Sequence, residues 1–570
     1  MSPETDNSGF PTDYEIAQQA EKQPIVDIVE PFGLEKADLE LYGEYKAKLR
    51  MSAIERVRNE TNESGKLILV TGMTPTPLGE GKTVTTVGLG QSFNHIGKDA
   101  LICIREPSLG PVFGVKGGAA GGGYSQVLPM EDINLHFTGD LHALTSAHNL
   151  IAAMLDNHIR QEQEPIIDRK AVAWKRAIDM NDRALRETVI GLGSTGGAVR
   201  EDGFLLTAAS EVMAVLCLAD GLGDLKARLA RMIVGYDHEG SPVTVDDIDA
   251  TGAATMLLRD AIQPNIVQTI EGTPAFVHGG PFANIAHGTN SLIADDVASG
   301  LADYLLTEAG FGSDLGAEKF MNIVCGFGDM EPDAVTLVTT VRALKYHGLD
   351  MWPADLDVLD EEDVEAVKAG FDNLDKHVAN LEKFGVPVVI AINQFPTDTE
   401  AELNAVLSHA TEDLEVRAAI SEVFSGGGEG GEALAHEVVA AAEETSTFTP
   451  LYEVDEPIKD KIERIAIEIY GADGVNYSAQ AEEDIAQLTD LGMDEMPICM
   501  SKTFHSLSDD PSKKGVPTNW ELDIRELYPS AGAGFLVVLT GDVLTLPGLP
   551  SVPAAANMDI DESGRISGLF

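Results

Sequence analysis

The sequence predicts an α/β fold in which helices cover both faces of a mostly parallel sheet. Short apolar runs alternate along the chain with segments of helical periodicity, and this alternation is typical of parallel strands joined by helices. Glycine is abundant, with 56 residues among 570, whereas aromatic residues make up only 6%. Many glycines suit the tight turns that such a fold requires where its strands end.

The expected elements follow one another in chain order. Strands are predicted at residues 66–70, 99–105, 275–277, 321–324, 334–338, 386–392 and 535–539. Helices are predicted at residues 35–60, 208–219, 296–307, 361–382 and 457–470. The alternation of the two types argues for a sheet that is covered on both faces.

A glycine-rich loop follows the first of these strands and is the most informative part of the chain. It ends in Gly81-Lys82-Thr83, at the expected start of a helix. Such a loop holds the phosphates of ATP or GTP, because backbone N–H groups surround the phosphate oxygens, the lysine adds a positive charge, and the threonine hydroxyl can bind Mg²⁺. Thr76 stands where the common pattern has glycine, and two prolines stiffen the loop. The residues expected to bind ATP are Thr76, Pro77, Leu78, Gly79, Glu80, Gly81, Lys82 and Thr83, with Thr83 at the metal of Mg-ATP.

The same loop places the nucleotide-binding part of the protein early in the chain. Strand, loop, helix and the second strand (99–105) make a βαβ unit, so we expect a P-loop NTPase-like core. A chain of this length is expected to hold about three to four domains. We expect a polar tail over residues 1–20, a nucleotide-binding domain over 21–360, an α/β domain over 361–450 and a C-terminal α/β domain over 451–570.

The charge of the chain excludes one class of partner. Lys and Arg number 39 against 93 Asp and Glu, which gives a formal net charge of -54. An acidic protein of this kind repels the phosphate backbone, so no nucleic-acid partner is expected. The carboxylates are spread along the whole chain, as in proteins from a salt-saturated cytoplasm. We therefore expect a halophilic host.

Cysteine usage and the first residues indicate a cytoplasmic protein. Cys103, Cys217, Cys325 and Cys499 lie far apart and lack the spacing of a disulfide motif or a metal site. They are expected to be reduced core residues. The N-terminus is acidic and polar, unlike a signal or transit peptide. No apolar run approaches the roughly 18 residues that a membrane span needs, so no membrane partner is expected.

Two further positions suit a binding site. Arg105 ends the second predicted strand and opens a glycine-rich loop, residues 105–123, which we call the Arg105 loop. Ligands of open α/β sheets bind at the carboxyl ends of strands, where an arginine can grip a carboxylate or phosphate through two parallel hydrogen bonds. A structural ion pair in a surface loop is the alternative. Asp140 precedes a helical pattern, so it either caps that helix or presents a carboxylate to a reacting amine.

Aromatic and histidine residues leave other interpretations open. Phe395 and Phe424 each stand at the edge of a loop, where they either stack on a flat heterocycle or close the edge of the core. His136, His142 and His148 repeat every six residues, which turns about 240° per step on a helix. They do not share a face, so no zinc site is expected.

Six long motifs give the chain a resemblance to a known family. They are Thr74-Pro-Thr-Pro-Leu-Gly-Glu-Gly-Lys-Thr83, Arg105-Glu-Pro-Ser-Leu-Gly-Pro111, Phe137-Thr-Gly-Asp-Leu-His-Ala143, His278-Gly-Gly-Pro-Phe-Ala-Asn-Ile-Ala-His-Gly288, Glu308-Ala-Gly-Phe-Gly-Ser-Asp-Leu-Gly-Ala-Glu-Lys-Phe320 and Ser530-Ala-Gly-Ala-Gly-Phe535. In these motifs the chain resembles the formate–tetrahydrofolate ligases (formyltetrahydrofolate synthetases), and the resemblance covers residues 25 to 570. Together with the charge, it implies a halophilic archaeon as the host. The resemblance implies an ATP-dependent ligase that forms a C–N bond. ATP, formate and tetrahydrofolate would give ADP, phosphate and 10-formyltetrahydrofolate through formyl phosphate.

The resemblance also implies catalytic roles for three residues. Lys82 would hold the phosphoryl group that ATP transfers, in the domain 21–360. Arg105 would grip formate and then formyl phosphate. Asp140 would face the folate amine and take its proton.

The implied folate pocket draws on the domain 361–450. Glu106 would bind folate, and Phe395 and Phe424 would lie on either side of the pterin ring. The family often has tryptophan where Phe424 stands, so stacking should be weaker here and the natural pterin carrier is left open. Activation by a monovalent cation, K⁺ or NH₄⁺, and assembly as a homotetramer are further properties that the resemblance implies.

Two other functions fit the phosphate-binding loop. A regulatory ATPase would bind nucleotide in order to control a partner protein. Another ATP-dependent ligase would activate a longer carboxylic acid. The several polar loops at strand ends favour an enzyme over a regulatory switch.

The charge predicts that the folded protein needs salt. Repulsion among 93 carboxylates, offset by only 39 cationic side chains, should unfold the chain at low ionic strength. The Debye length, over which charges repel each other before salt screens them, is about 30 Å at 0.01 M salt but only about 3 Å at 1 M. Thermal unfolding followed by circular dichroism should therefore show a Tm that rises with KCl. A Tm that does not rise with KCl would argue against a halophilic host.

Overall fold

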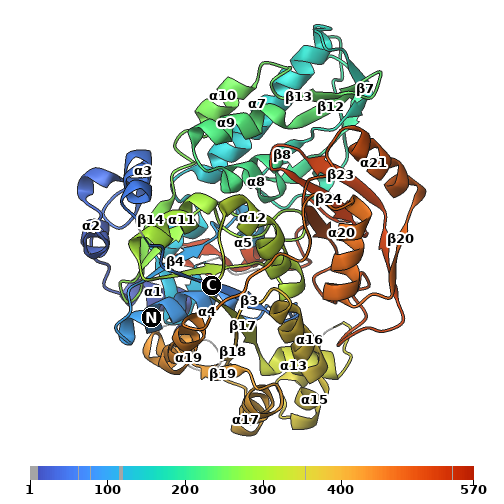
Figure 1. Ribbon diagram of the computed structural model, residues 1–570. Coiled ribbons are helices and arrows are strands. Elements are labelled where there is room, and N and C mark those ends of the chain that lie inside the picture. The colour runs from blue at the N-terminus through green and yellow to red at the C-terminus, as the bar shows by residue number, and fades with distance from the viewer. Residues whose placement is uncertain are drawn as a thin grey trace.

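A twelve-stranded sheet forms the centre of the computed structural model, which describes residues 10–61, 63–77, 79–114, 120–353, 355–541 and 543–569 (Figure 1). In spatial order its main path is β1 (Leu39–Leu41), β2 (Ala47–Leu49), β14 (Asn265–Thr269), β15 (Pro274–Val277), β4 (Ala100–Ile104), β16 (Tyr304–Glu308), β3 (Lys66–Gly72), β17 (Ala334–Thr339), β18 (Val388–Asn393) and β19 (Arg417–Ser421). Two short strands, β5 (Gly121–Gly122) and β6 (Ser125–Leu128), extend the sheet from β14.

Most of this sheet is parallel. The seven neighbouring strands from β15 to β19 all run in one direction. β14 is antiparallel to β15, and β2 and β1 continue the antiparallel edge. Parallel neighbours need crossover connections, which helices supply here. The predicted α/β class and mostly parallel sheet are therefore confirmed.

Helices cover both faces of the sheet, as predicted. One face carries α4 (Lys82–His95) and α19 (Glu432–Ala442), and the other carries α11 (Leu292–Leu301) and α16 (Phe371–Glu382). Along β3, Ile68 and Val70 pack in the first layer, whereas Leu67 and Leu69 pack in the second. Successive side chains of a strand point to opposite faces, so a strand covered on both sides is apolar at every position.

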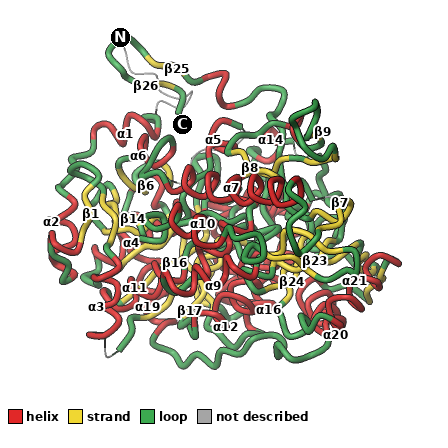
Figure 2. The backbone as a smooth tube through the Cα atoms, turned by 90° about the horizontal axis from the view of Figure 1, so that it is seen from above, coloured by secondary structure: helices red, strands yellow, loops and turns green. Residues whose placement is uncertain are grey.

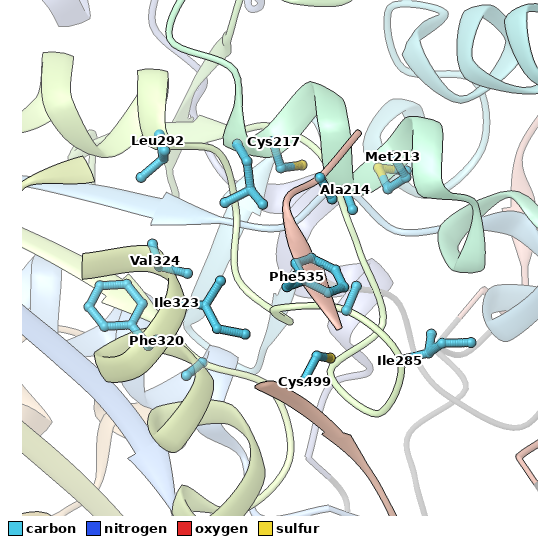
Figure 3. Close-up of a cluster of buried hydrophobic side chains, with 14 of the residues drawn as sticks. Met213, Ala214, Cys217, Ile285, Leu292, Phe320, Ile323, Val324, Cys499 and Phe535 are labelled. Atoms are coloured by element: carbon cyan, nitrogen blue, oxygen red, sulfur yellow. The ribbon is translucent and has the colours of Figure 1, made fainter. Parts of the chain in front are cut away.

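Two further α/β regions pack around the sheet. The first, at the top of Figure 1, contains α7 (Asp140–Arg160), α8 (Glu211–Leu218), α9 (Leu222–Arg231), α10 (Thr251–Leu257), β7 (Ile167–Val172), β12 (Ile233–Asp237) and β13 (Pro242–Thr244). The C-terminal region contains α20 (Ile458–Arg464), α21 (Ala479–Asp490), β20 (Gly474–Tyr477), β21 (Ile498–Ser501), β22 (Glu521–Ile524), β23 (Glu526–Ser530) and β24 (Phe535–Leu539). One buried cluster joins these regions to the centre (Figure 3). It contains Met213 and Cys217 of α8, Phe535 of β24, and Phe320 from the helical segment Phe320–Val324.

Shorter elements complete the fold. They are α1 (Asp13–Gln19), α2 (Ile25–Val29), α5 (Leu109–Phe113), α6 (Met130–Asn134), α12 (Cys325–Gly328), α13 (Val341–Gly348), α14 (Leu356–Leu359), α15 (Val364–Ala369), α17 (Glu400–Ser408), α18 (Val423–Gly426), β8 (Arg176–Ile178), β9 (Thr188–Ile190), β10 (Arg200–Asp202), β11 (Phe204–Leu206), β25 (Asp559–Ile560) and β26 (Ile566–Ser567). Helix α1 lies near the last described residues (Figure 2), and Tyr14 and Ala17 of α1 share a buried cluster with Leu569. Part of the expected polar tail, residues 1–20, is therefore a packed helix.

Three predicted elements differ from the structure. Residues 35–60 do not form one helix, because β1 and β2 make a hairpin there and only α3 (Met51–Glu60) is helical. The predicted helix 296–307 runs into β16, which lies between β3 and β4. The predicted strand 321–324 is helical. Each of these segments has short apolar runs, and such runs do not distinguish a buried strand from a buried helix.

The state of the cysteines and the character of the helices can be compared with the expectations from the sequence. All four cysteines are buried and free, as the sequence predicts. Within the described ranges, none of the helices has both the length and the apolar character required to cross a bilayer.

Candidate functional site

The carboxyl ends of β3, β4 and β16 meet at one edge of the sheet. Val70 of β3 lies opposite Glu308 of β16, and Cys103 of β4 lies opposite Thr307. The order in which strands are added to the sheet reverses here. The strand after β3, β4, lies on one side of it, whereas the strand after β16, β17, lies on the other side. Open α/β sheets bind their ligands at such a switch point.

The phosphate loop, residues 73–81, joins the end of β3 to the start of α4; Leu78, which was predicted to bind ATP, lies outside the described residues. Gly81 precedes the helix in a left-handed conformation with φ 73°. Lys82 is the first residue of α4, and its Cδ would lie 3.3 Å from a Cβ added at Gly72. A helix N-terminus and a lysine therefore occupy one place, and both favour bound phosphate.

Glu80 braces the inside of the phosphate loop. Its buried carboxylate accepts hydrogen bonds from the Thr76 N–H, at 2.6 Å, and from the Thr340 hydroxyl. The Glu80 carbonyl accepts from Asn393 Nδ2 at 3.1 Å. A Cβ added at Gly81 would lie 2.5 Å from that nitrogen, so this position requires glycine. Thr76 and Glu80 thus shape the loop from within.

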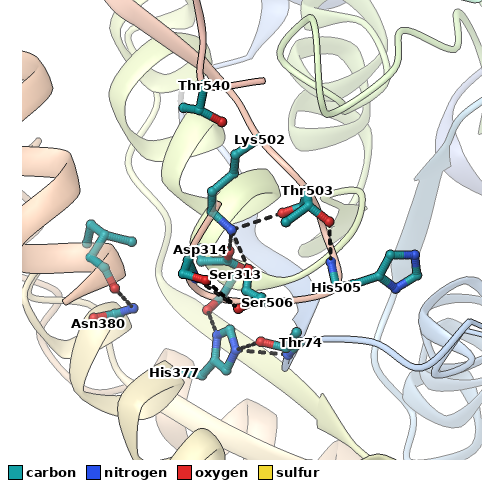
Figure 4. A network of polar contacts seen from close by, with 12 residues as sticks. Thr74, Ser313, Asp314, His377, Asn380, Lys502, Thr503, His505, Ser506 and Thr540 are labelled. Atoms are coloured by element: carbon teal, nitrogen blue, oxygen red, sulfur yellow. Dashed lines mark hydrogen bonds and ion pairs between the residues drawn. The ribbon is translucent and has the colours of Figure 1, made fainter. Parts of the chain in front are cut away.

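Two buried histidines, His347 and His377, hold the backbone of Thr74 at the start of the phosphate loop, and Figure 4 shows the contacts of His377. The Thr74 N–H donates to Nε2 of His377 at 2.8 Å, and Nδ1 of His377 lies 2.6 Å from the Ser313 hydroxyl. Nε2 of His347 lies 3.0 Å from the Thr74 carbonyl, and the Gly515 N–H donates to its Nδ1 at 3.1 Å. Each ring accepts at one nitrogen and can donate at the other, as a neutral imidazole does. Burial lowers the pKa of His377 to about 4 and the pKa of His347 to about 3.

The same network reaches the C-terminal region. Nζ of Lys502 lies 2.8 Å from the carboxylate of Asp314, and both side chains are buried. Lys502 also donates to the carbonyls of Thr503 and Ser506 (Figure 4). Loss of one partner from such a pair leaves an uncompensated buried charge, at a cost of about 3–5 kcal/mol. Asp314 follows Ser313, so this ion pair also fixes the residue that orients His377.

Glu308 connects the phosphate loop helix to the Arg105 loop. Its Oε2 accepts a hydrogen bond from the Thr83 hydroxyl at 2.8 Å. Its Oε1 lies 3.3 Å from Nε and 3.4 Å from Nη2 of Arg105. The Glu308 side chain is 2% exposed and the Arg105 side chain 25%. Arg105 therefore forms a structural ion pair, and its side chain is also partly exposed. The predicted ion pair is present, and the remaining exposure is compatible with the predicted ligand contact.

Asp140 lies in a buried ion pair. Its Oδ2 accepts hydrogen bonds from Lys48 Nζ and Asn265 Nδ2, each at 2.8 Å, and Lys48 also donates to the Gln263 carbonyl at 2.9 Å. The side chains of Lys48 and Asp140 are 1% and 2% exposed. The residue that caps α7 is Gly139, so the interpretation of Asp140 as the cap is wrong.

Glu106 is buried beside this ion pair. Burial raises the pKa of Glu106 well above its usual value; the carboxylate of Asp140 acts in the same direction, and Lys48 opposes it. The Glu106 N–H donates to the Gly279 carbonyl at 2.6 Å. Its Oε2 has no hydrogen-bond partner within the described part of the chain. Buried polar atoms are normally hydrogen-bonded, so this oxygen is suited to a polar group of a ligand.

Phe395 and Phe424 follow the adjacent strands β18 and β19, at the same edge of the sheet as the phosphate loop. The guanidinium of Arg342 lies 5.0 Å from the ring centre of Phe395. The ring of Phe10 stacks on Phe424, with 5.6 Å between centroids and 27° between planes. Both residues are half-buried. Their role around a pterin stays a prediction.

Several residues of this site were not predicted from the sequence, among them Lys48, Glu308 and the two histidines that hold Thr74. Lys48 lies in the hairpin β1–β2, within the segment that was expected to be one helix. Glu308 ends β16, which was mostly read as helix. A correct strand assignment for residues 304–308 would have placed Glu308 at a strand end, where ligands bind.

Burial of His377 predicts a contribution to the pH dependence of stability that glutamine at this position should remove. His377 stays neutral in the folded protein down to a pKa of about 4, whereas an unfolded histidine gains a proton near 6.5. The unfolded state then binds more protons, so stability falls from pH 6.5 to 4 by about 1.4 kcal/mol per pH unit from this group. In His377→Gln this dependence is absent. The difference in unfolding free energy between wild type and variant, measured by denaturant at high KCl, should shrink over that range and stay constant above about pH 7.

Asn380→Ala provides a matched control on the same helix. Asn380 is buried and donates to the Ile469 carbonyl at 2.8 Å, but it does not titrate. Its destabilisation should be the same at every pH. A pH-independent difference for His377→Gln as well would show that the histidine is not held neutral.

Known proteins match the chain along nearly its whole length. Residues 11–570 match the family model described as Formate--tetrahydrofolate ligase. A formate–tetrahydrofolate ligase from Haloquadratum walsbyi is 68% identical over 570 residues, which cover 99% of this chain and 98% of the relative. Another from Haloarcula marismortui is 68% identical over 552 residues, which cover 96% and 100%. Both organisms are halophilic archaea, in agreement with the expectation from the charge. The chain therefore belongs to the formate–tetrahydrofolate ligase family.

Proposed function

We propose that this protein joins formate to tetrahydrofolate at the expense of ATP, through formyl phosphate. One observation carries the proposal beyond family membership. Thr83, next to the phosphate loop, and Arg105 bond the two oxygens of one carboxylate, that of Glu308. A group for the nucleotide and a group for an anionic substrate therefore lie side by side, as transfer of a phosphoryl group from one to the other requires.

The chemistry explains why both groups are needed. Formate is a poor acyl donor, because its carboxylate has no leaving group. When a formate oxygen attacks the γ-phosphorus of ATP, ADP leaves and a mixed anhydride remains. Lys82 and the N-terminus of α4 offset the charge of the transferred phosphoryl group, and Arg105 orients formate and then formyl phosphate.

The second step needs a proton acceptor, and we assign this role to Asp140. The folate amine attacks the carbonyl carbon of formyl phosphate, the C–N bond forms, and phosphate leaves as the nitrogen loses its proton. Lys48 and Asn265 both donate to Oδ2 of Asp140, and Oδ1 is the oxygen that we propose receives that proton. Lys48 thereby positions the base without contacting substrate.

The folate pocket is proposed to lie between Glu106 and the two phenylalanines. The buried Oε2 of Glu106 lacks a partner among the described residues and suits a polar group of the pterin. Phe395 and Phe424 follow the neighbouring strands β18 and β19 in the segment 361–450, so that segment would supply the stacking faces.

Several finer properties of the protein belong to this proposal. The strand–loop–helix formed by β3, the phosphate loop and α4 supports a P-loop NTPase-like core. Mg²⁺ would reach the nucleotide beside Thr83 and would neutralise phosphate charge. From the family resemblance we also propose activation by K⁺ or NH₄⁺, a homotetramer, a cytoplasmic location, and domains over 21–360, 361–450 and 451–570.

Omission of each substrate in turn tests the proposed reaction. ATP consumption, measured with a coupled assay for ADP at high KCl, should require both formate and tetrahydrofolate, because formyl phosphate is consumed only by the folate amine. Acetate in place of formate should give little turnover. The same ATPase rate without formate and folate would support a regulatory ATPase, and equal rates with acetate would support a ligase for longer acids.

Replacement of Arg105 by alanine tests the anion site. Loss of this contact to formate and formyl phosphate should cost about 2–5 kcal/mol of transition-state binding, which is about 30-fold to several thousand-fold in kcat/KM for formate. The Kd for ATP should change little. Arg259→Ala is the control, because Arg259 is exposed and pairs with its neighbour Asp260. Near-normal turnover of Arg105→Ala would remove Arg105 from the site.

A further inference from the structure

Glu308 is a buried carboxylate for which the proposed reaction has no role so far. It ends β16, the strand between β3 and β4, and lies opposite Val70, three residues before the phosphate loop. Its backbone carbonyl accepts a hydrogen bond from the Thr289 hydroxyl at 2.8 Å, and Ala309 N–H donates to the Val70 carbonyl at 2.9 Å. The backbone on both sides of the carboxylate is therefore fixed to the sheet.

The two oxygens of Glu308 face different functional groups. One accepts from the Thr83 hydroxyl at 2.8 Å, a normal length for such a bond. The other lies 3.3 Å from Arg105, which is longer than the roughly 2.7–2.9 Å of a strong charge-assisted bond. Arg105 is thus a loose counterion for a carboxylate that is otherwise removed from water.

We propose that Glu308 and Thr83 together hold the Mg²⁺ of Mg-ATP. The inference rests on the proposed function, in which the phosphate loop binds ATP. Mg²⁺ prefers oxygen ligands, and in nucleotide sites it is held by one or two carboxylates together with phosphates and water. P-loop proteins combine the hydroxyl that follows the loop lysine with a carboxylate. Here Thr83 follows Lys82, and Glu308 is the carboxylate that bonds it.

A role for Glu308 as counterion of Arg105 alone is the competing explanation. It predicts that removal of the charge changes the site in the same way with and without metal. A metal-binding role predicts that the loss appears only when Mg²⁺ is present. The two explanations therefore differ in nucleotide binding, which can be measured without turnover.

The test is calorimetric titration of ATP with and without Mg²⁺, at high KCl, for wild type and Glu308→Gln. Glutamine preserves the shape and an oxygen that can accept from Thr83. Wild type should bind ATP more tightly with Mg²⁺ than with EDTA. The factor by which Mg²⁺ tightens ATP binding should be about tenfold or more smaller in the variant than in wild type. The Kd of the variant for ATP without metal should stay within about threefold of wild type. A full gain from Mg²⁺ in Glu308→Gln would overturn the proposal.

Glu318→Gln is the matched control. Glu318 is a buried glutamate ten residues further along the chain, and its carboxylate bonds Asn322 at 2.8 Å rather than Thr83. This variant should keep the full Mg²⁺ effect. If wild type itself fails to bind ATP, the proposed function is contradicted; if wild type gains from Mg²⁺ and Glu308→Gln gains equally, only the role of Glu308 is contradicted.

A second variant covers the case in which Glu308→Gln does not fold. Glu308→Asp keeps the charge but withdraws it by one methylene. Because Mg²⁺ needs short, near-octahedral contacts whereas Ca²⁺ accepts longer ones, the ratio of nucleotide affinities with Mg²⁺ and Ca²⁺ should shift toward Ca²⁺ by about threefold or more. An unchanged ratio would contradict direct metal binding by Glu308.

Discussion

Burial of the parallel strands on both faces is the constraint on which the rest of the structure depends. β3 has apolar side chains at successive positions because layers of helices cover each side of it. A strand of this kind can present polar groups to a ligand only where it ends. The phosphate loop, Arg105 and Glu308 lie at the ends of three neighbouring strands, so the geometry of the site is set by the register of the sheet.

Buried lysines are a second theme, and they bear on the charge of the surface. Lys48, Lys345 and Lys502 each pair with a buried carboxylate, and Lys319 and Lys461 donate to backbone carbonyls in the interior. A chain with only 39 Lys and Arg thus keeps several of its cations inside. The solvent-facing part is left poorer in positive charge than the composition alone indicates, which strengthens the expected need for screening by salt.

The parts of the site that could be predicted from the sequence are local ones. The phosphate loop and Arg105 stand directly after apolar runs, so their place at strand ends follows from a few neighbouring residues. Lys48 and Glu308 act through partners 92 and 225 residues away, and no short pattern signals such pairing. The prediction also failed where apolar segments were equally compatible with helix and strand, as for β16 and residues 321–324.

The hold of His347 on Thr74 has a consequence for the order in which the protein matures. His347 is oriented by the Gly515 N–H, which lies 441 residues after Thr74 (515 − 74). During synthesis the sheet strands that surround the phosphate loop are complete long before residue 515 has been made. The nascent chain therefore passes through a stage in which the strands and His377 have been made but Gly515 does not yet orient His347, and the C-terminal region completes the hold on Thr74.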